Sequence, residues 1–198
     1  MHAAPRPGFS DPVRASQQVF RAVLDALAMP GAIRPVPPVL DPPPPLTPSL
    51  AAVVLALSDA ETPLWLDAPL AASEEVALWL RFHTGAPLVG EPHAAAYALV
   101  ADAARCPAFE RFAQGTNEYP DRSATLVLAV GSLAKGERLS LRGPGVAGVE
   151  RLAAAPLPPD FVPRLAANRA LFPRGVDLLL AGPGCVAGIA RSVEVSEG

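Results

Sequence analysis

Three side chains able to bind a charged group, Arg81, His83 and Thr84, stand together where a glycine and a proline end a predicted helix. The negative end of the helix dipole favours cations at this position. Arginine also binds phosphate and phosphonate oxygens through paired hydrogen bonds. These residues therefore either cap the helix, with Arg81 and His83 bonding its last carbonyl groups, or form a polar surface that binds an anion or a partner chain.

A second polar segment, Gly-Thr-Asn-Glu-Tyr-Pro-Asp-Arg-Ser at residues 115–123, lies directly before a predicted buried strand. Such a segment is either an ordinary connection or a site, because loops on a rigid scaffold often carry binding residues. Arg191, expected on the last strand, is a third anion-binding candidate. The candidates from these two regions are Gly115, Thr116, Asp121, Ser123 and Arg191.

The motifs of self-sufficient catalysis are weak, and no catalytic residue is assigned. Glycines within 143–148 fit G-x-G-x-x-G, but nearby prolines truncate the helix that a dinucleotide site requires, so a turn is favoured. His2, His83 and His93 do not cluster, and no metal site is predicted. Lys135, the sole lysine, falls in a predicted hairpin turn, so a pyridoxal-phosphate Schiff base is not expected and no cofactor is predicted.

Composition narrows the class of protein further. The 198 residues suit one domain spanning 1–198, and no apolar run approaches the ~20 residues of a membrane span. A net charge of −3 without a basic stripe argues against nucleic acid as a partner. Cys106 and Cys185 lie far apart and are expected to be reduced thiols in a cytoplasmic protein, with a disulfide between them as the alternative.

Helices and strands are expected to alternate around these polar segments. A helix at about 11–29 precedes a proline-rich loop at about 34–48. Further helices are expected at 47–57, 73–84, 107–113 and 160–170, and strands at 64–66, 97–100, 124–130, 138–142, 176–180 and 186–195. The mixture predicts a three-layer α/β domain with a mixed sheet.

Six segments, in order along the chain, resemble the PhnH family, a subunit of the bacterial carbon–phosphorus lyase system. They are Phe20–Gly31, Asp59–Leu66, Leu80–Leu88, Gly115–Leu126, Leu141–Val146 and Phe172–Leu178. Two departures are visible: Asp121 stands where the family tends to have glutamate, and residues 190–193 lack two threonines of the family pattern. Arg191 and Glu194 persist, but a role for hydroxyl groups in the last strand is not supported here.

The resemblance implies a fold similar to the large domain of pyridoxal-phosphate transferases, without their cofactor site. It implies a cytoplasmic core complex with PhnG, PhnI and PhnJ, the PhnL ATPase as a more transient partner, and a homodimer for the isolated chain. The implied step replaces the adenine of ATP with an alkylphosphonate, which is the ribose 1-methylphosphonate 5-triphosphate synthase step. In the family the nucleosidase chemistry is assigned to PhnI, so no catalytic residue is carried over.

Three hypotheses follow from these observations. The first is an accessory subunit of the phosphonate ribosyl-transfer complex that presents the segments 81–84 and 115–123 to a partner or to an anionic ligand. The second is an independent small-molecule enzyme with an anion pocket. The third is a structural homodimer whose polar motifs form its own interface.

Overall fold

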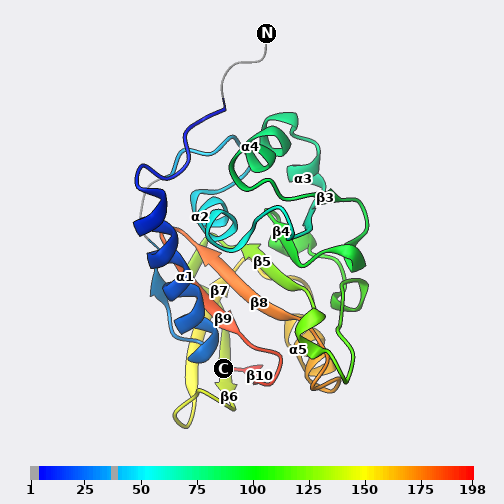
Figure 1. The fold of residues 1–198 in the computed structure, drawn as a ribbon. Helices are drawn as coiled ribbons and strands as arrows, with labels where there is room; N and C mark the ends of the chain where they lie inside the picture. Colours follow the sequence, from blue (N-terminus) through cyan, green and yellow to red (C-terminus); the bar gives the residue numbers. More distant parts are fainter. Residues whose placement is uncertain (1–4, 37–39) are drawn as a thin grey trace.

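A seven-stranded mixed sheet runs through the centre of the computed structural model, which describes residues 5–36 and 40–198 (Figure 1). The sheet order is β1 (Arg34–Pro35), β9 (Cys185–Ile189), β8 (Asp177–Gly182), β5 (Thr125–Ala129), β4 (Tyr97–Val100), β2 (Leu64–Leu66) and β3 (Leu88–Val89). The strands from β8 to β3 are mutually parallel, whereas β9 is antiparallel to both of its neighbours. The parallel strands therefore share one amino-terminal edge and one carboxyl-terminal edge.

One face of this sheet is covered by helices α1 (Pro12–Ala28), α2 (Pro48–Leu57), α3 (Ala68–Ala71) and α4 (Glu74–Thr84). Asp11 caps α1 by accepting a hydrogen bond from the Arg14 N–H at 3.1 Å, as its position before the apolar stripe predicts. Val127 and Leu179 point from the sheet into the same apolar cluster as the buried side of α1 and α2. Because burial on this face is continuous, the helices form one packed layer.

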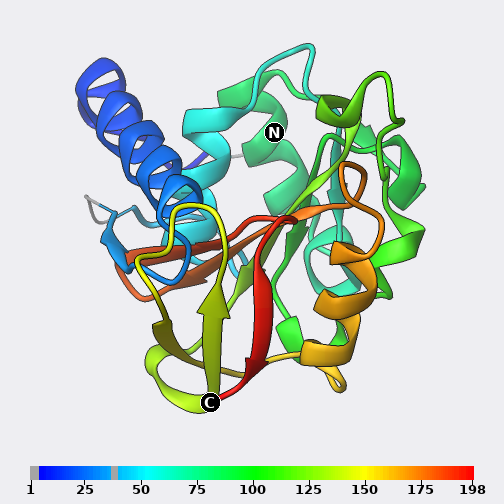
Figure 2. The ribbon, with the colours of Figure 1, turned by 90° about the horizontal axis from the view of Figure 1, so that it is seen from below.

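The opposite face is covered by a second sheet and by α5 (Phe161–Arg169), as Figure 2 shows. The second sheet is antiparallel, with the order β10 (Glu194–Glu197), β6 (Ser132–Arg142) and β7 (Glu150–Ala155). Alternate residues of the large sheet, Leu126 and Leu178 among them, pack into this second cluster. The predicted mixed α/β arrangement is confirmed, and the small second sheet is a feature that the sequence did not indicate.

The expected last strand is wrong as a single element. Residues 185–189 belong to the large sheet and residues 194–197 to the small one, so the chain changes sheets between them. Arg191 lies in the connecting turn, which the Val193 N–H closes by donating to the Ala190 carbonyl at 2.9 Å. Apolar residues stand on both sides of this turn, so the sequence gives no clear sign of the break.

Two further expectations need correction. The segment 107–113 forms only a short 3₁₀ turn, η3 (Phe109–Arg111), and this single turn is enough to bury Phe109 and Phe112, three residues apart, in the same apolar cluster. Lys135 lies within β6, at an irregularity of register between Ser132 and Glu137, and not in a hairpin turn. The other 3₁₀ turns are η1 (Pro92–Ala94), η2 (Ala103–Arg105) and η4 (Pro120–Arg122).

The proline-rich stretch at 34–48 is partly extended, as expected, and contributes β1 at the sheet edge. Its residues 37–39 lie outside the described part of the chain, as does His2. Among the described helices, none combines the length and the apolar character needed to cross a bilayer.

Candidate functional site

Arg191 is the centre of the most extensive polar network in the described structure. Its Nε and Nη2 donate to the two carboxylate oxygens of Asp177 at 3.1 and 2.5 Å, and its backbone N–H donates to Asp177 Oδ1 at 2.8 Å. Nη1 donates to the carbonyls of Pro120 and Pro173 at 2.8 and 3.4 Å, and Nη2 also donates to Ser123 Oγ at 2.5 Å. A guanidinium has five N–H donors, and all five are used here. These five residues are called the Arg191 cluster below.

The Arg191 cluster lies at the amino-terminal edge of the parallel strands, because Asp177 begins β8 and Ser123 shortly precedes β5. The Arg191 side chain is only 14% exposed, and the Asp177 side chain 22%. With every donor committed inside the protein, Arg191 has no spare hydrogen bond for an anionic ligand. The geometry makes it a clamp that fixes the loop before β5, the loop before β8 and the turn after β9.

The loop 115–123 is shaped by its own backbone as well as by Arg191. Gly115 has φ +69°, and a Cβ there would lie 2.8 Å from the Pro120 carbonyl oxygen. The Thr116 N–H donates to the Tyr119 carbonyl at 3.1 Å, and the Tyr119 N–H donates back to Thr116 Oγ1 at 3.0 Å. Asp121 is exposed and makes no side-chain hydrogen bond to a described residue. Of this loop's candidates, Asp121 alone keeps its functional group free for an outside contact within the described structure.

Of the polar residues at the end of α4, only Thr84 caps the helix within the described structure. Thr84 Oγ1 donates to the Leu80 carbonyl at 2.7 Å and accepts from the Ala86 N–H at 3.0 Å. Gly85 then leaves the helix in the left-handed region, with φ 69°. Arg81 is exposed and its side chain bonds to none of the described residues. The predicted cap by Arg81 and His83 is therefore wrong: Thr84 caps the helix, and Arg81 stays available.

His83 is tied to the amino-terminal segment of the chain. Its Nε2 lies 2.9 Å from the Arg6 carbonyl oxygen, which also accepts a 2.9 Å hydrogen bond from Trp79 Nε1. Because a carbonyl only accepts, His83 Nε2 must carry a proton in this contact. The ring also packs against Trp79 and Phe82, at centroid distances of 4.6 and 5.0 Å. His83 thus helps to hold the segment before α1 against α4.

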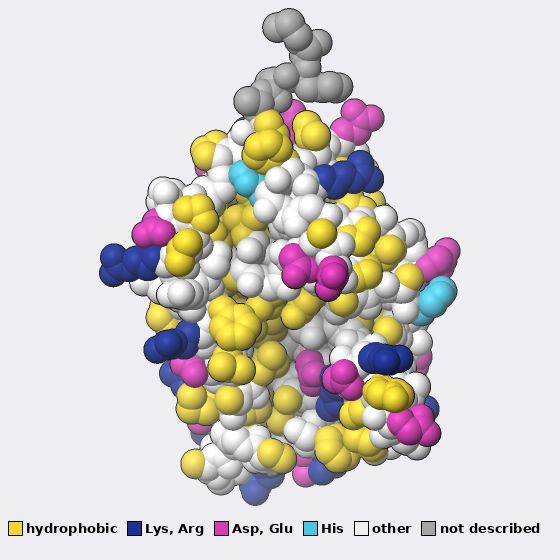
Figure 3. Space-filling model, in the orientation of Figure 1, with side chains coloured by type: hydrophobic (Ala, Val, Ile, Leu, Met, Phe, Trp, Pro, Cys, Tyr) yellow, Lys and Arg dark blue, Asp and Glu magenta, His cyan; other side chains and the backbone are white. Residues whose placement is uncertain are grey.

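The two predicted polar groups do not form one site. The end of α4 leads into β3 at the margin of the large sheet, whereas the Arg191 cluster lies at β5 and β8, with β2 and β4 between them. The structure brings Gly115, Thr116, Ser123 and Arg191 together, and it places Arg81, His83 and Thr84 elsewhere. Figure 3 shows that, on the face it presents, basic side chains are scattered among acidic ones and form no continuous patch.

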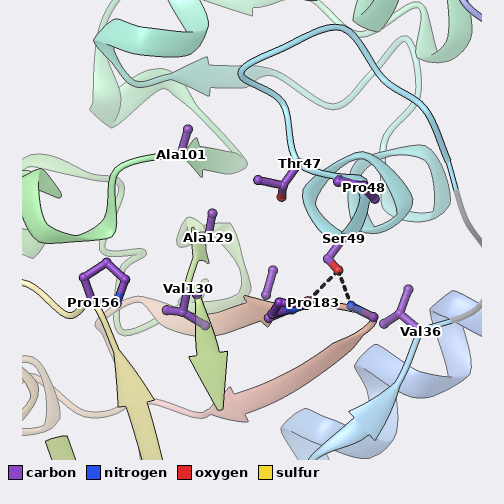
Figure 4. Close-up of a pocket in the computed structure, with 13 residues that line it drawn as sticks. Val36, Thr47, Pro48, Ser49, Ala101, Ala129, Val130, Pro156 and Pro183 are labelled. Atoms are coloured by element: carbon purple, nitrogen blue, oxygen red, sulfur yellow. Dashed lines mark hydrogen bonds between the residues drawn. The ribbon is translucent and has the colours of Figure 1, made fainter. Parts of the chain in front are cut away.

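A cavity of about 620 Å³ lies at the opposite, carboxyl-terminal edge of the parallel strands, and the sequence motifs did not indicate it (Figure 4). It opens where β4, β5 and β8 end, next to the first residues of α2 and the turn between β8 and β9. Open α/β sheets often bind ligands outside the carboxyl ends of their strands. The lining residues are Val36, Thr47, Pro48, Ser49, Ala101, Ala129, Val130, Gly131, Pro156, Ala181, Gly182, Pro183 and Gly184.

Ser49 fixes one wall of this cavity. Its buried hydroxyl donates to the Gly182 carbonyl at 2.6 Å and accepts from the Gly184 N–H at 3.2 Å, which ties α2 to the turn after β8 (Figure 4). The available sequence signal was indirect: Thr47-Pro48 predicts a helix start, and an alanine stands at or next to the last residue of three strands. Only the register of the sheet brings these small residues together.

Burial shifts the pKa values of several titratable groups. Desolvation raises the pKa of Asp67, which accepts hydrogen bonds from the N–H groups of Leu70 and Asp102 at 3.2 and 3.0 Å. Burial also raises the pKa of the Cys106 thiol to about 12 and, in direction, that of Cys185. Both cysteines are free, so the disulfide alternative is wrong. A protonated buried thiol is a poor nucleophile, and this argues against nucleophilic chemistry at Cys106.

Within residues 5–36 and 40–198, no group of three or more His, Cys, Asp or Glu side chains is arranged to hold a metal ion. Lys135 is exposed on the small sheet and is not among the residues that line the cavity. A Schiff base could therefore not form between this lysine and a ligand seated in that cavity.

Comparisons with known proteins account for nearly the whole chain. Residues 7–196 match the family described as "PhnH: Bacterial phosphonate metabolism protein (PhnH)". The chain belongs to the PhnH family. It is also 41% identical, over 94% of its length and 93% of the relative's, to "Alpha-D-ribose 1-methylphosphonate 5-triphosphate synthase subunit PhnH" of Rhizobium meliloti (strain 1021).

A second, less similar relative matches a smaller part of the chain. The "Putative C-P lyase subunit protein HtxG" of Stutzerimonas stutzeri is 32% identical over 82 residues, 41% of this chain and 42% of the relative. Both relatives are named as subunits, so the PhnH family assignment connects this chain with multi-subunit assemblies.

Proposed function

We propose that this chain is the PhnH-type subunit of an assembly that makes α-D-ribose 1-methylphosphonate 5-triphosphate during phosphonate catabolism. The observation that carries the proposal is the 41% identity to a subunit of that name, which extends over 94% of the chain. In this role the chain supports the transfer of alkylphosphonate onto the ribose of ATP and does not turn over substrate alone. The commitment of all five Arg191 donors to protein acceptors supports a structural role for this arginine over anion binding.

The partners on this proposal are PhnG-, PhnI- and PhnJ-type subunits in the cytoplasm, with a PhnL-type ATPase bound more transiently. Arg81 and Asp121 are the two predicted charged residues whose side chains stay exposed and unbonded among the described residues, so they are assigned to partner contacts. The proposal includes neither nucleic acid nor a membrane as a partner; on the face that Figure 3 shows, basic and acidic side chains are mixed.

For the isolated chain we propose a homodimer formed through the outer side of α1. Val13, Phe20 and Leu24 are 70%, 51% and 56% exposed there, at spacings that place them on one side of the helix. Two antiparallel copies of α1 would bring Phe20 of each against Leu24 of the other. The same arrangement brings Arg21 of one copy near Asp25 of the other, so the surface is complementary to itself in apolar contacts and in charge, as a two-fold interface requires.

Two structural expectations also stay proposals. We propose that residues 1–198 fold as one domain and that the large sheet corresponds to the large domain of pyridoxal-phosphate transferases without their cofactor site. The seven strands, of which β9 runs against both neighbours, support the second point. An experimental structure superposed on such a transferase tests it, and a single unfolding transition by calorimetry tests the first.

The decisive test of function is genetic and biochemical. A strain lacking its own PhnH subunit should grow on methylphosphonate as sole phosphorus source when supplied with this chain, and the chain should co-purify with a tagged PhnG- or PhnI-type subunit. Turnover of ATP and methylphosphonate by the purified chain alone would contradict the accessory role. Arg81→Ala and Asp121→Ala should weaken co-purification, whereas Arg174→Ala, another exposed arginine change, should not.

The dimer is tested separately. Phe20→Glu should shift the isolated chain to the monomer in size-exclusion chromatography with light scattering, because it places a charge in an apolar interface. Glu75→Ala, on an exposed position of α4, is the control and should leave the oligomeric state unchanged. If Arg81→Ala shifted the chain to the monomer and Phe20→Glu did not, the dimer interface would lie at the end of α4 and not on α1.

A further inference from the structure

The cavity at the carboxyl-terminal edge has the size and composition of a small-molecule site, apart from any role of the chain in an assembly. Its volume of about 620 Å³ lies within the roughly 300–1,000 Å³ that ligand pockets of proteins span. Figure 4 shows Ala101 and Ala129 on one side and Thr47 and Ser49 on the other, with Pro156 and Pro183 along the sheet. Small side chains from three strands leave this space open.

The chemistry of the lining limits what can fill it. All thirteen lining residues lack an ionisable side chain, and all but two are alanine, valine, proline or glycine. A phosphate, phosphonate or carboxylate would lose hydration there and would meet no charged side chain, only the partial positive charge at the amino end of α2, so its burial is costly. The lining therefore favours a ligand that is uncharged and mostly apolar.

The first turn of α2 supplies the polar contacts. Thr47 Oγ1 accepts a 3.3 Å hydrogen bond from the Leu50 N–H, but its own O–H has no acceptor among the described residues. The backbone N–H of Ser49 likewise has no acceptor in the described structure, as is usual for the first residues of a helix. Both groups donate, so a ligand needs an acceptor, such as a carbonyl oxygen or a ring nitrogen, on the side that faces α2.

We propose that this cavity binds an uncharged, mainly apolar small molecule that presents one hydrogen-bond acceptor to Thr47 and Ser49. The proposal does not rest on the function assigned above: the cavity lies at the opposite edge of the sheet from the Arg191 cluster, and its ligand is not the charged substrate of a synthase. It assigns a separate binding function to the carboxyl-terminal edge.

Binding is tested with the purified chain and three probes: acetophenone, which is uncharged and has one acceptor, benzoate, which is similar in size but anionic, and inorganic phosphate. Saturable binding of acetophenone in ligand-observed NMR titrations, about tenfold or more tighter than that of benzoate, is expected. Tighter binding of benzoate or phosphate, or no saturable binding of acetophenone, overturns the proposal. None of these outcomes bears on growth on methylphosphonate or on co-purification, so the two proposals fail separately.

Variants locate the site. Ala101→Leu extends a half-buried lining side chain into the cavity and should abolish acetophenone binding, whereas Ala153→Leu, a half-buried alanine on β7 outside the lining, should leave it unchanged.

Thr47→Val removes the free hydroxyl and should weaken the binding of acetophenone several-fold, while the binding of toluene, which has no acceptor, should be unaffected. Because Thr47 also caps α2, circular dichroism must first show that this variant folds; the Ala101 pair decides the location independently. Equal binding by both alanine variants would overturn the assignment to this cavity.

Discussion

The two edges of the parallel strands use their polar groups in opposite ways. At the amino-terminal edge, the guanidinium of Arg191 gives all five donors to neighbouring protein oxygens. At the carboxyl-terminal edge, a cavity without ionisable lining residues keeps two donors of α2 unpaired among the described residues. The dense run of polar residues at 115–123 therefore lies where the protein's own hydrogen bonds are made. The cavity, by contrast, is lined mainly by alanine, valine, proline and glycine.

The largest expected effect is the loss of Arg191. Arg191→Ala strands the partly buried Asp177 carboxylate and releases two loops, so the free energy of unfolding should fall by about 2–4 kcal/mol. Urea denaturation measures this change. Arg174→Ala, at an exposed position nearby in the chain, should stay within about 0.5 kcal/mol of the parent. Equal stabilities of the two variants would mean that the amino-terminal edge is not held by the Arg191 cluster.

Gly115→Ala tests the loop that the Arg191 cluster holds at the amino-terminal edge. A Cβ at φ +69° would also press on the Pro120 carbonyl that accepts from Arg191, so a loss of about 1–2 kcal/mol is expected. The same change made in the Arg191→Ala background should cost less, because the loop is then free to relax. Strict additivity in the double-mutant cycle would show that the loop and the clamp are independent.

Ser49→Ala probes the opposite edge. It removes a buried hydroxyl that bridges the Gly182 carbonyl and the Gly184 N–H, and a loss of about 1 kcal/mol is expected in urea denaturation. Ser58→Ala is the matched control, because the Ser58 hydroxyl is buried without a partner among the described residues, and its removal should be neutral or slightly stabilising. A larger loss from Ser58→Ala than from Ser49→Ala would contradict the bridge.

The smallest effect concerns pH. Asp67 is buried without an arginine partner, and desolvation raises its pKa above the ordinary value of 3.8. The folded chain then holds this proton to a higher pH than the unfolded chain does. The free energy of unfolding should therefore fall as pH rises from 3.8 through the raised pKa, and level off above it. Asp67→Asn should lack this slope when urea unfolding is followed from pH 3.5 to 7; an unchanged slope would assign it to another group.

The parts of the fold that local physics determines were predicted correctly. A capping aspartate followed by an apolar stripe identified α1, and continuous apolar runs identified β5 and β8, which are buried on both faces. By contrast, β7 was missed: its sequence Glu-Arg-Leu-Ala-Ala-Ala has only one large apolar side chain, and its pairing with β6 supplies the rest of its stability. Long-range pairing of this kind leaves little trace in a single sequence.

The sequence identified polar residues of the candidate site but not the hydrogen bonds that they make. Arg191 and Ser123 were identified 68 positions apart, yet Asp177, which bonds Arg191 most extensively, was not recognised as their partner. The pairing of Arg191 with Asp177 depends on the turn that follows β9. The sequence suggested that this turn was part of a strand. The cavity carries still less signal, because it is formed by the absence of large side chains at three strand ends.

Gly188, on β9, shows how a position far from both edges constrains the surface of the molecule. A Cβ at this residue would lie 2.5 Å from the Ala26 carbonyl oxygen, so α1 packs directly on the backbone of the strand. Any larger residue would lift the carboxyl end of α1 and re-aim Phe20 and Leu24 on its outer side. Random mutagenesis with selection for the dimer proposed through α1 should therefore recover substitutions at Gly188 as loss-of-association alleles, although this residue lies beneath α1 and not on its outer side.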